Sequence, residues 1–208
     1  MFKRIALAAA LAAATTAAFA APVTYTIDPT HTDVIASWSH LGFSNPVAHF
    51  GQVDGTITYD PQNVGASSVS VTIPLAGMNS HVAAFDKHLR SAELFEADKY
   101  PNITFKSTQV EAAGEGRLRV AGDLTVKGVT KPAVLDVTLN KVGEHPMKKV
   151  PTIGFDATTT LKRSEFGIDY GIAVGVSDEI RIRITTEASV AKSDAAPRAK
   201  ASIPPKTK

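Results

Sequence analysis

Every second position is apolar in Ser68-Val69-Ser70-Val71-Thr72-Ile73-Pro74-Leu75. Successive side chains of a β-strand point to opposite faces of a sheet, so this alternation predicts a strand with one buried face. The same period recurs on both sides of the stretch, as early as residues 23–27 and as late as residues 180–184. The chain therefore predicts roughly eight or more strands between Val23 and Val190.

One segment breaks the period of two. Apolar residues recur there at intervals of three and four positions, at Val82, Phe85, Leu89, Ala92 and Phe95. This spacing places them on one face of an amphipathic helix, which is either continuous or divided at Ser91 into two short helices. The segment ends at Tyr100-Pro101, because the residue before a proline disfavours the helical conformation.

Many antiparallel strands with one helical insertion favour an all-β fold, an antiparallel barrel with a short helical segment over one end. Closure removes the exposed strand edges that would otherwise pair with other chains. A two-sheet sandwich is the alternative architecture. A barrel of about eight strands is just wide enough for packed side chains or one small ligand, so its size permits a cavity without requiring one.

Apolar residues of the strands and of the helical segment are expected to meet in one interior. The strand residues are Trp38, Phe50, Val71, Ile73, Phe105, Leu124, Phe155 and Ile182, and the helical residues packed across its mouth are Phe85, Leu89 and Phe95. They either interdigitate as a solid core, the usual outcome for an apolar stripe, or surround an apolar ligand. Beside the mouth, Lys87, His88 and Arg90 either meet an anionic head group or form a solvated helix face.

The two ends of the chain differ from the part between them. Lys3 and Arg4 precede an Ala-rich apolar run that ends in Ala18-Phe19-Ala20, which predicts a secretory signal peptide over residues 1–20. We therefore expect a periplasmic protein that does not span the membrane. Residues 192–208 mix Ala, Pro, Lys and Ser without apolar periodicity and predict a disordered basic tail. A single domain over residues 21–191 is left.

The distribution of charge argues against nucleic acid as a partner. The chain has 22 Lys and Arg residues against 20 Asp and Glu, a net charge of +2. Two basic residues precede residue 21, and five basic residues and one acidic residue follow residue 191. The domain keeps 15 basic and 19 acidic side chains, a net charge of −4, which is the wrong sign for binding a phosphate backbone.

No residue pattern predicts a metal, a cofactor or catalysis. Two imidazoles that share a zinc ion are typically spaced i, i+4 on a helix or at alternate positions of a strand, and neither spacing occurs among His31, His40, His49, His81 and His88. The sequence also contains no Cys and no Gly-x-Ser-x-Gly nucleophile motif. The sequence therefore favours a binding protein over an enzyme.

Seven motifs, taken in order, resemble the YceI-like family of periplasmic, lipocalin-like isoprenoid-binding proteins. They are residues 28–32, 39–44, 50–51, 86–95, 100–105, 122–132 and 163–167. No single motif is specific, but their order across the whole domain is.

This resemblance implies an eight-stranded, lipocalin-like barrel with a helical lid around an elongated pore. The implied ligand is a long amphiphile, such as a polyisoprenoid phosphate, an isoprenoid quinone or a fatty amide. Burial contributes ~0.8 kcal/mol for each CH₂ of such a chain, so a dry pore can hold it with few polar contacts. Arg163, in the last motif, joins His88 and Arg90 as a candidate for contacting the head group.

Three functions follow from these observations. The first is a carrier or sequestering protein for such an amphiphile in the periplasm, acting as a monomer or a homodimer. The second is an enzyme that acts on an isoprenoid lipid through His40 or Arg163. The third is a solid-core envelope stress protein whose basic tail contacts anionic surfaces.

Overall fold

The computed structural model describes residues 21–191, so the predicted signal peptide and basic tail lie outside the described residues. Within this range the chain forms one α-helix, α1 (Ala83–Arg90), and none of its helices is long and apolar enough to cross a membrane. The strands are β1 (Val23–Ile27), β2 (Asp33–Ser37), β3 (Val47–Phe50), β4 (Asp54–Tyr59), β5 (Ser68–Pro74), β6 (Met78–Asn79), β7 (Asn102–Ala112), β8 (Arg117–Val126), β9 (Val129–Glu144), β10 (Pro151–Lys162) and β11 (Glu179–Ser189).

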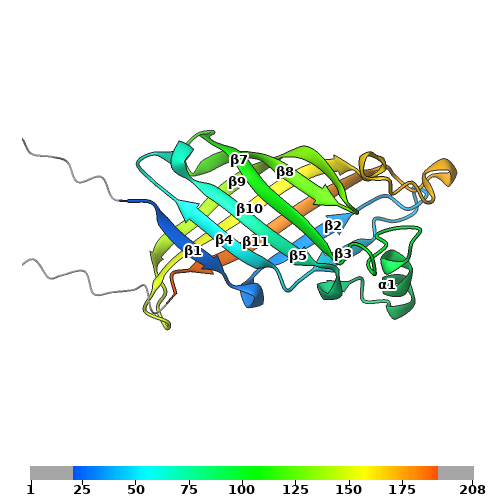
Figure 1. The fold of residues 1–208 in the computed structure, drawn as a ribbon, viewed down its shortest axis with the longest axis horizontal. Coiled ribbons are helices and arrows are strands. Elements are labelled where there is room, and N and C mark those ends of the chain that lie inside the picture. The colour runs from blue at the N-terminus through cyan, green and yellow to red at the C-terminus, as the bar shows by residue number, and fades with distance from the viewer. Residues whose placement is uncertain (1–20, 192–208) are drawn as a thin grey trace, which may run out of the picture.

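The strands form one closed antiparallel barrel (Figure 1). The ring closes because β1 pairs with β4 on one side and with β11 on the other. β2 also pairs with β11, farther along that strand, so β1 and β2 are two parts of one interrupted strand. The pairs β3–β4 and β5–β6 are interrupted in the same way. The predicted barrel of eight long strands is thereby confirmed, and the two-sheet sandwich is wrong.

The three interruptions lie side by side in the barrel wall. In the first, Pro29 has no N–H for the ladder, and the backbone N–H of Thr30 donates to Asp28 Oδ1 at 3.0 Å. In the other two, Gly51 N donates to Gly77 O at 3.1 Å. A Cβ on Gly77 would stand 2.4 Å from the Gly51 carbonyl oxygen, so this close approach requires glycine. Local turn chemistry thus breaks three neighbouring strands at the same level.

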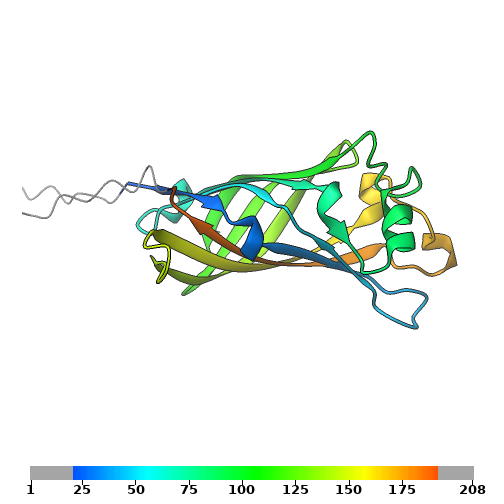
Figure 2. The same ribbon diagram turned by 90° about the horizontal axis from the view of Figure 1, so that it is seen from below.

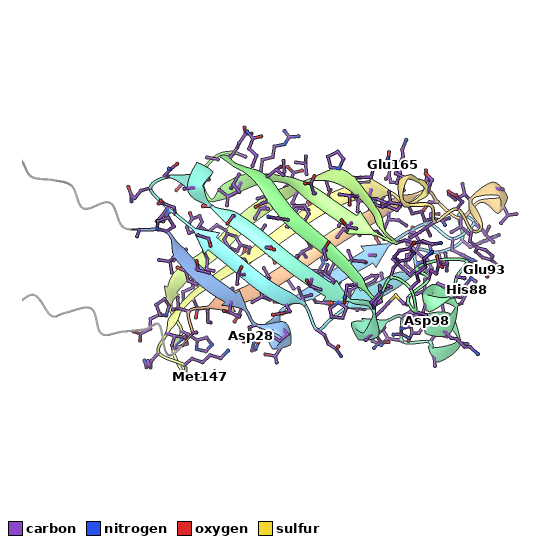
Figure 3. All side chains as sticks on the ribbon, in the orientation of Figure 1. Asp28, His88, Glu93, Asp98, Met147 and Glu165 are labelled. Carbon is purple, nitrogen blue, oxygen red and sulfur yellow. The ribbon has the colours of Figure 1, made fainter. Side chains whose placement is uncertain are left out.

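The barrel has two different ends. α1, the β2–β3 loop (residues 38–46) and the β10–β11 loop (residues 163–178) lie at one end, which we call the helix end (Figure 2). The opposite end carries the β7–β8 and β9–β10 hairpins, and we call it the hairpin end. Figure 3 labels His88 and Glu93 at the helix end, and Met147 at the hairpin end with Asp28 toward it.

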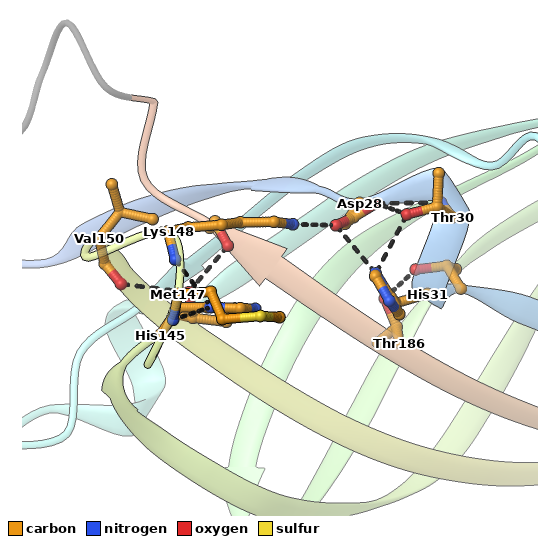
Figure 4. Close-up of polar contacts among 11 residues, drawn as sticks. Asp28, Thr30, His31, His145, Met147, Lys148, Val150 and Thr186 are labelled. Carbon is orange, nitrogen blue, oxygen red and sulfur yellow. Dashed lines mark hydrogen bonds and ion pairs between the residues drawn. The ribbon is translucent and has the colours of Figure 1, made fainter.

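A polar network around Asp28 fastens the hairpin end (Figure 4). Asp28 Oδ2 lies 2.6 Å from Lys148 Nζ and 3.1 Å from His31 Nδ1. Lys148 belongs to the β9–β10 hairpin, where His145 Nδ1 accepts hydrogen bonds from two backbone N–H groups. The Lys148 ammonium and then the Thr30 hydroxyl hold the pKa of Asp28 well below its ordinary value. The network therefore ties the first interruption of the wall to a hairpin far along the chain.

The helical prediction is half confirmed. α1 forms as expected and ends at Arg90, because Ser91 adopts an extended backbone. The predicted second helix is wrong, since residues 91–100 form a series of turns in which Phe95 N donates to Leu89 O at 3.0 Å. This hydrogen bond folds the chain back on α1 and brings the Phe95 ring to the Phe50 ring, with centroids 5.9 Å apart.

Candidate functional site

An apolar cavity of about 250 Å³ lies inside the barrel. Its lining residues come from every strand of the ring, from Tyr59 and Ser67 near the hairpin end to Phe166 and Ile168 near the helix end. They face inward because strand side chains alternate between the two faces of the wall. A solid core, the alternative interpretation of the apolar stripe, does not describe this interior.

Most of the predicted interior residues line this cavity. Those that do are Phe50, Val71, Ile73, Phe95, Phe105, Leu124, Phe155 and Ile182. Further lining residues, such as Val34, Val120 and Ile184, follow the same alternation and could have been predicted from it. Phe166 and Ile168 lie in the β10–β11 loop, where no alternation in the sequence predicts which side chains point inward.

The remaining three predicted residues belong to the lid and not to the cavity wall. The rings of Trp38 and Phe85 lie 5.9 Å apart at their centroids, and Leu89 is buried on α1. None of these three is among the residues that line the cavity. The helical segment therefore reaches the cavity through Phe95 and not through the apolar face of α1.

Polar groups on the cavity wall are few and mostly hydroxyls. Of the residues that line it, Tyr59 and Arg163 are the ones whose side chains ionise. The hydroxyls of Thr32 and Thr186 lie 2.8 Å apart and satisfy each other. Burying a polar group without a partner is costly, so this pairing keeps the wall dry. The threonines are 154 residues apart in sequence, and no sequence signal could have paired them.

Arg163 stands at the helix end of the cavity and holds the β10–β11 loop together. Its Nε donates to Ser177 O at 2.9 Å, Nη1 to Ile168 O at 3.0 Å and Tyr170 O at 2.8 Å, and Nη2 to Val176 O at 3.3 Å. These bonds use four of the five N–H groups of a guanidinium. Burial lowers the pKa of Arg163, although it stays charged at neutral pH.

The Asp178 carboxylate accepts its hydrogen bonds from Ser164 and not from Arg163. The backbone N–H and the hydroxyl of Ser164 donate to Asp178 at 2.9 and 2.8 Å, and they lower the pKa of Asp178. No ion pair within 4 Å joins Arg163 to a carboxylate in residues 21–191. Asp178 and Asp169 act on Arg163 at longer range and partly offset the effect of burial on its pKa. The helix end of the cavity thus carries a guanidinium with one free N–H group and no carboxylate of the described chain within 4 Å.

The other two head-group candidates lie outside the cavity wall. Arg90 donates through Nε to Leu75 O at 3.1 Å, in the turn after β5, and through Nη2 to Met78 O on β6, whose other side pairs with no strand of the described residues. His88 stacks edge-on against Tyr170, with ring centroids 4.8 Å apart, and its Nδ1 lies 3.6 Å from Glu93. Of the three, Arg163 is the one that lines the cavity.

The histidines do not assemble into a site. His49 Nδ1 lies 2.7 Å from Asp33 Oδ2, while His40 forms backbone bridges with Ser44 and Val176. Across residues 21–191 no group of three His, Asp or Glu side chains could hold a metal ion.

Comparison with known proteins identifies the same barrel elsewhere. The family model of the YceI-like domain matches residues 25–188. A UPF0312 protein of Vibrio cholerae is 38% identical over 188 residues, which covers 89% of this chain and 97% of that protein.

Two solved structures share the fold. The crystal structure of Burkholderia cenocepacia BcnA matches with a TM-score of 0.70 and 25% identity, over 78% of this chain and 99% of that one. A polyisoprenoid binding domain from Saccharophagus degradans matches with a TM-score of 0.62 and 14% identity, over 80% of this chain and 98% of that one.

Proposed function

Because this chain belongs to the YceI-like domain family, we propose that it binds one long, mostly apolar amphiphile inside its barrel and carries or sequesters it without turnover. The observation that carries the proposal is the apolar cavity, whose lining extends from Tyr59 to Ile168. A wall of this composition favours a hydrocarbon chain, since each buried CH₂ contributes ~0.8 kcal/mol and needs no polar partner.

The ligand class we propose is an isoprenoid or a similarly long lipid: a polyisoprenoid, an isoprenoid quinone or a fatty amide. The Saccharophagus degradans domain that shares the fold is described as polyisoprenoid binding, which supports this class. That domain shares the fold at 14% identity, and the apolar wall of the cavity is what favours a long hydrocarbon chain in this protein.

We propose that the head group of the ligand lies at the helix end, next to Arg163. Arg163 is partly buried and has no carboxylate of residues 21–191 within 4 Å. Such a guanidinium favours an anionic or strongly hydrogen-bonding group nearby. Arg163 has one N–H group left for such a contact after its four carbonyl bonds. The walls toward the hairpin end then receive the apolar chain.

Binding without turnover is proposed because the cavity wall lacks a base. The ionisable residues that line it are Tyr59 and Arg163, and Arg163 is held in place by backbone carbonyls. General acid–base chemistry requires a group that can exchange a proton near the operating pH. The protein is further proposed to act in the periplasm after removal of residues 1–20, with residues 21–191 as the binding domain.

Native mass spectrometry of protein purified from the periplasm tests the proposal. Wild-type protein is expected to carry a co-purified apolar ligand. Ala157→Phe fills the cavity from β10 and is expected to abolish this mass, because Ala157 lines the wall. Thr158→Phe is the matched control, since Thr158 is the next residue of the same strand and is exposed. Ligand-free wild-type protein, or equal ligand in both variants, would overturn the proposal.

A further inference from the structure

Large apolar side chains are exposed on two loops at the helix end. Phe43 is 90% exposed and Leu41 is 42% exposed in the β2–β3 loop, while Val174 is 73% exposed and Tyr170 is 53% exposed in the β10–β11 loop. We call these four residues the apolar rim. Folding does not require an exposed Phe or Val, so contiguous exposed apolar side chains mark a surface that meets something apolar.

The two loops that carry the apolar rim are joined to each other. Leu41 N donates to Gly175 O at 3.2 Å, and the backbone of His40 forms a bridge with Val176. The Leu41 side chain also lies over Gly175, where an added Cβ would come within 3.4 Å of it. Figure 2 shows both loops at the helix end, beyond the barrel wall. The apolar rim is therefore one surface built from two distant parts of the chain.

The turn at the tip of the β2–β3 loop is unusual for an exposed position. Leu41 and Gly42 have positive φ angles of 56° and 76°, and Phe43 N donates to His40 O at 3.0 Å. A tight turn of this kind favours Asn, Asp or Gly at its first central position. This chain places a Leu there, which adds apolar surface at the expense of turn preference.

Charge is missing from the β2–β3 loop and from the tip of the β10–β11 loop, although the rest of the β10–β11 loop carries Arg163, Glu165, Asp169 and Asp178. Residues 34–53 and residues 170–177 contain no Asp, Glu, Lys or Arg. Hydrocarbon accepts apolar side chains and strongly rejects charged ones, so a charge-free apolar tip complements the interior of a membrane. The two tips, residues 38–46 and 170–177, offer no charge to an anionic or cationic partner.

We propose that the apolar rim inserts into the boundary between head groups and acyl chains of a lipid bilayer and holds the helix end of the barrel against the membrane. This inference rests on the proposed function, because a long apolar ligand resides in a bilayer before it is bound. The rim is continuous with the cavity: Ile168 lines the cavity, and Tyr170 of the rim follows it by two positions. Arg163 donates to the carbonyls of both residues.

Co-sedimentation with vesicles of neutral phosphatidylcholine tests the proposal. Replacing Phe43 and Val174 together by Asp is expected to lower vesicle binding at least about tenfold, because two apolar insertions are replaced by charges. Met147→Asp is the matched control, since Met147 is 84% exposed but lies at the hairpin end. Wild-type binding is expected to change little between low and high salt, because the four residues of the apolar rim carry no charge.

Three results would overturn the proposal. The first is absence of wild-type binding to neutral vesicles, or binding that requires anionic lipid and disappears in salt. The second is an equal loss in Met147→Asp and in the double variant. The third is a dimer of the wild-type protein that the double variant dissociates, since a second copy would then cover the rim. Circular dichroism checks that the double variant is folded, and Phe43→Ser provides a variant without added charge.

The ligand experiment separates this proposal from the proposed function. Protein loaded with a long-chain lipid from organic solvent is expected to keep the ligand mass in the Phe43, Val174 double variant. If wild-type protein binds vesicles but never carries a ligand, the proposed function fails and the docking surface remains. If it carries a ligand but ignores vesicles, the docking proposal alone fails.

Discussion

The two ends of the barrel are closed by different physical means. At the hairpin end, Asp28 pairs with Lys148 and His31, so charge holds the β9–β10 hairpin against the first interruption of the wall. At the helix end, Arg163 and Arg90 donate to backbone carbonyls, and the Trp38 and Phe85 rings and the Phe50 and Phe95 rings pack in two pairs. The helix end therefore relies on carbonyl-bound arginines and ring packing, whereas the hairpin end relies on a carboxylate paired with a lysine and a histidine.

Replacing Arg163 is expected to have the largest effect, and it tests whether the carbonyl bonds hold the helix end. Arg163→Met leaves four loop carbonyls without their donor and is expected to lower the free energy of unfolding by roughly 3 kcal/mol. Arg181→Met removes an exposed arginine of β11 and is the control, with an expected change of about 0.5 kcal/mol or less. Urea denaturation measures both; equal costs would remove Arg163 as the clamp of this end.

Phe95→Ala is expected to open the helix end of the cavity and to leave the hairpin end closed. The Phe50–Phe95 and Tyr59–Phe155 rings form similar edge-on pairs near opposite ends, with centroids 5.9 and 6.1 Å apart. Phe95→Ala is expected to cost about 2 kcal/mol and to speed release of a bound lipid, because Phe95 is the residue through which the helical segment lines the cavity. Tyr59→Leu is the comparison at the hairpin end and is expected to change the release rate less than Phe95→Ala, because Tyr59 lies far from the helical segment. Faster release in Tyr59→Leu alone would reverse the roles of the two ends.

Sequence predicts the wall of this molecule better than its ends. Alternation at residues such as Val71 and Ile73 follows from the backbone period of a strand, so the interior could be predicted without knowing how the strands pair. Sequence could not show that β1 and β2 pair with the same strand, since that depends on the register with β11.

The ends are less predictable because loop conformation decides what each side chain reaches. An arginine in a loop looks the same in sequence whether its side chain faces solvent or, like that of Arg163, donates hydrogen bonds to backbone carbonyls up to 14 positions away. Phe43 belongs to a motif that sequence singled out only by its resemblance to a family. Its exposure becomes evident once the β2–β3 and β10–β11 loops are seen to pair.

Asp28→Asn removes the negative charge that links the first interruption of the wall to the β9–β10 hairpin. It is expected to cost about 1–2 kcal/mol at pH 7, because the Lys148 and His31 contacts lose the carboxylate. The folded-state pKa of Asp28 lies below the unfolded value of ~3.9, so its stabilisation is complete above that pH and is lost as the pH falls below it.

Urea denaturation across this pH range measures the effect of Asp28. The difference between wild type and Asp28→Asn is expected to shrink as the pH falls from about 4 toward the folded-state pKa. Glu144→Gln removes an exposed carboxylate that pairs with Lys149 in the same region, at 3.6 Å, and is expected to have little effect. A gap that stays constant with pH would show that the Asp28 carboxylate does not act through its charge.

Glu93→Gln is expected to have the smallest effect, and it asks whether charge also matters at the helix end. Glu93 Oε2 lies 3.6 Å from His88 Nδ1, and the Glu93 side chain is 60% exposed, whereas the Asp28 side chain is 14% exposed. An exposed pair contributes about 0.5 kcal/mol or less, because water screens it and two side chains must be ordered. The His88 ring is held instead by its edge-on contact with Tyr170. If thermal denaturation shows Glu93→Gln to be as costly as Asp28→Asn, then ion pairs stabilise both ends and the contrast between them is wrong.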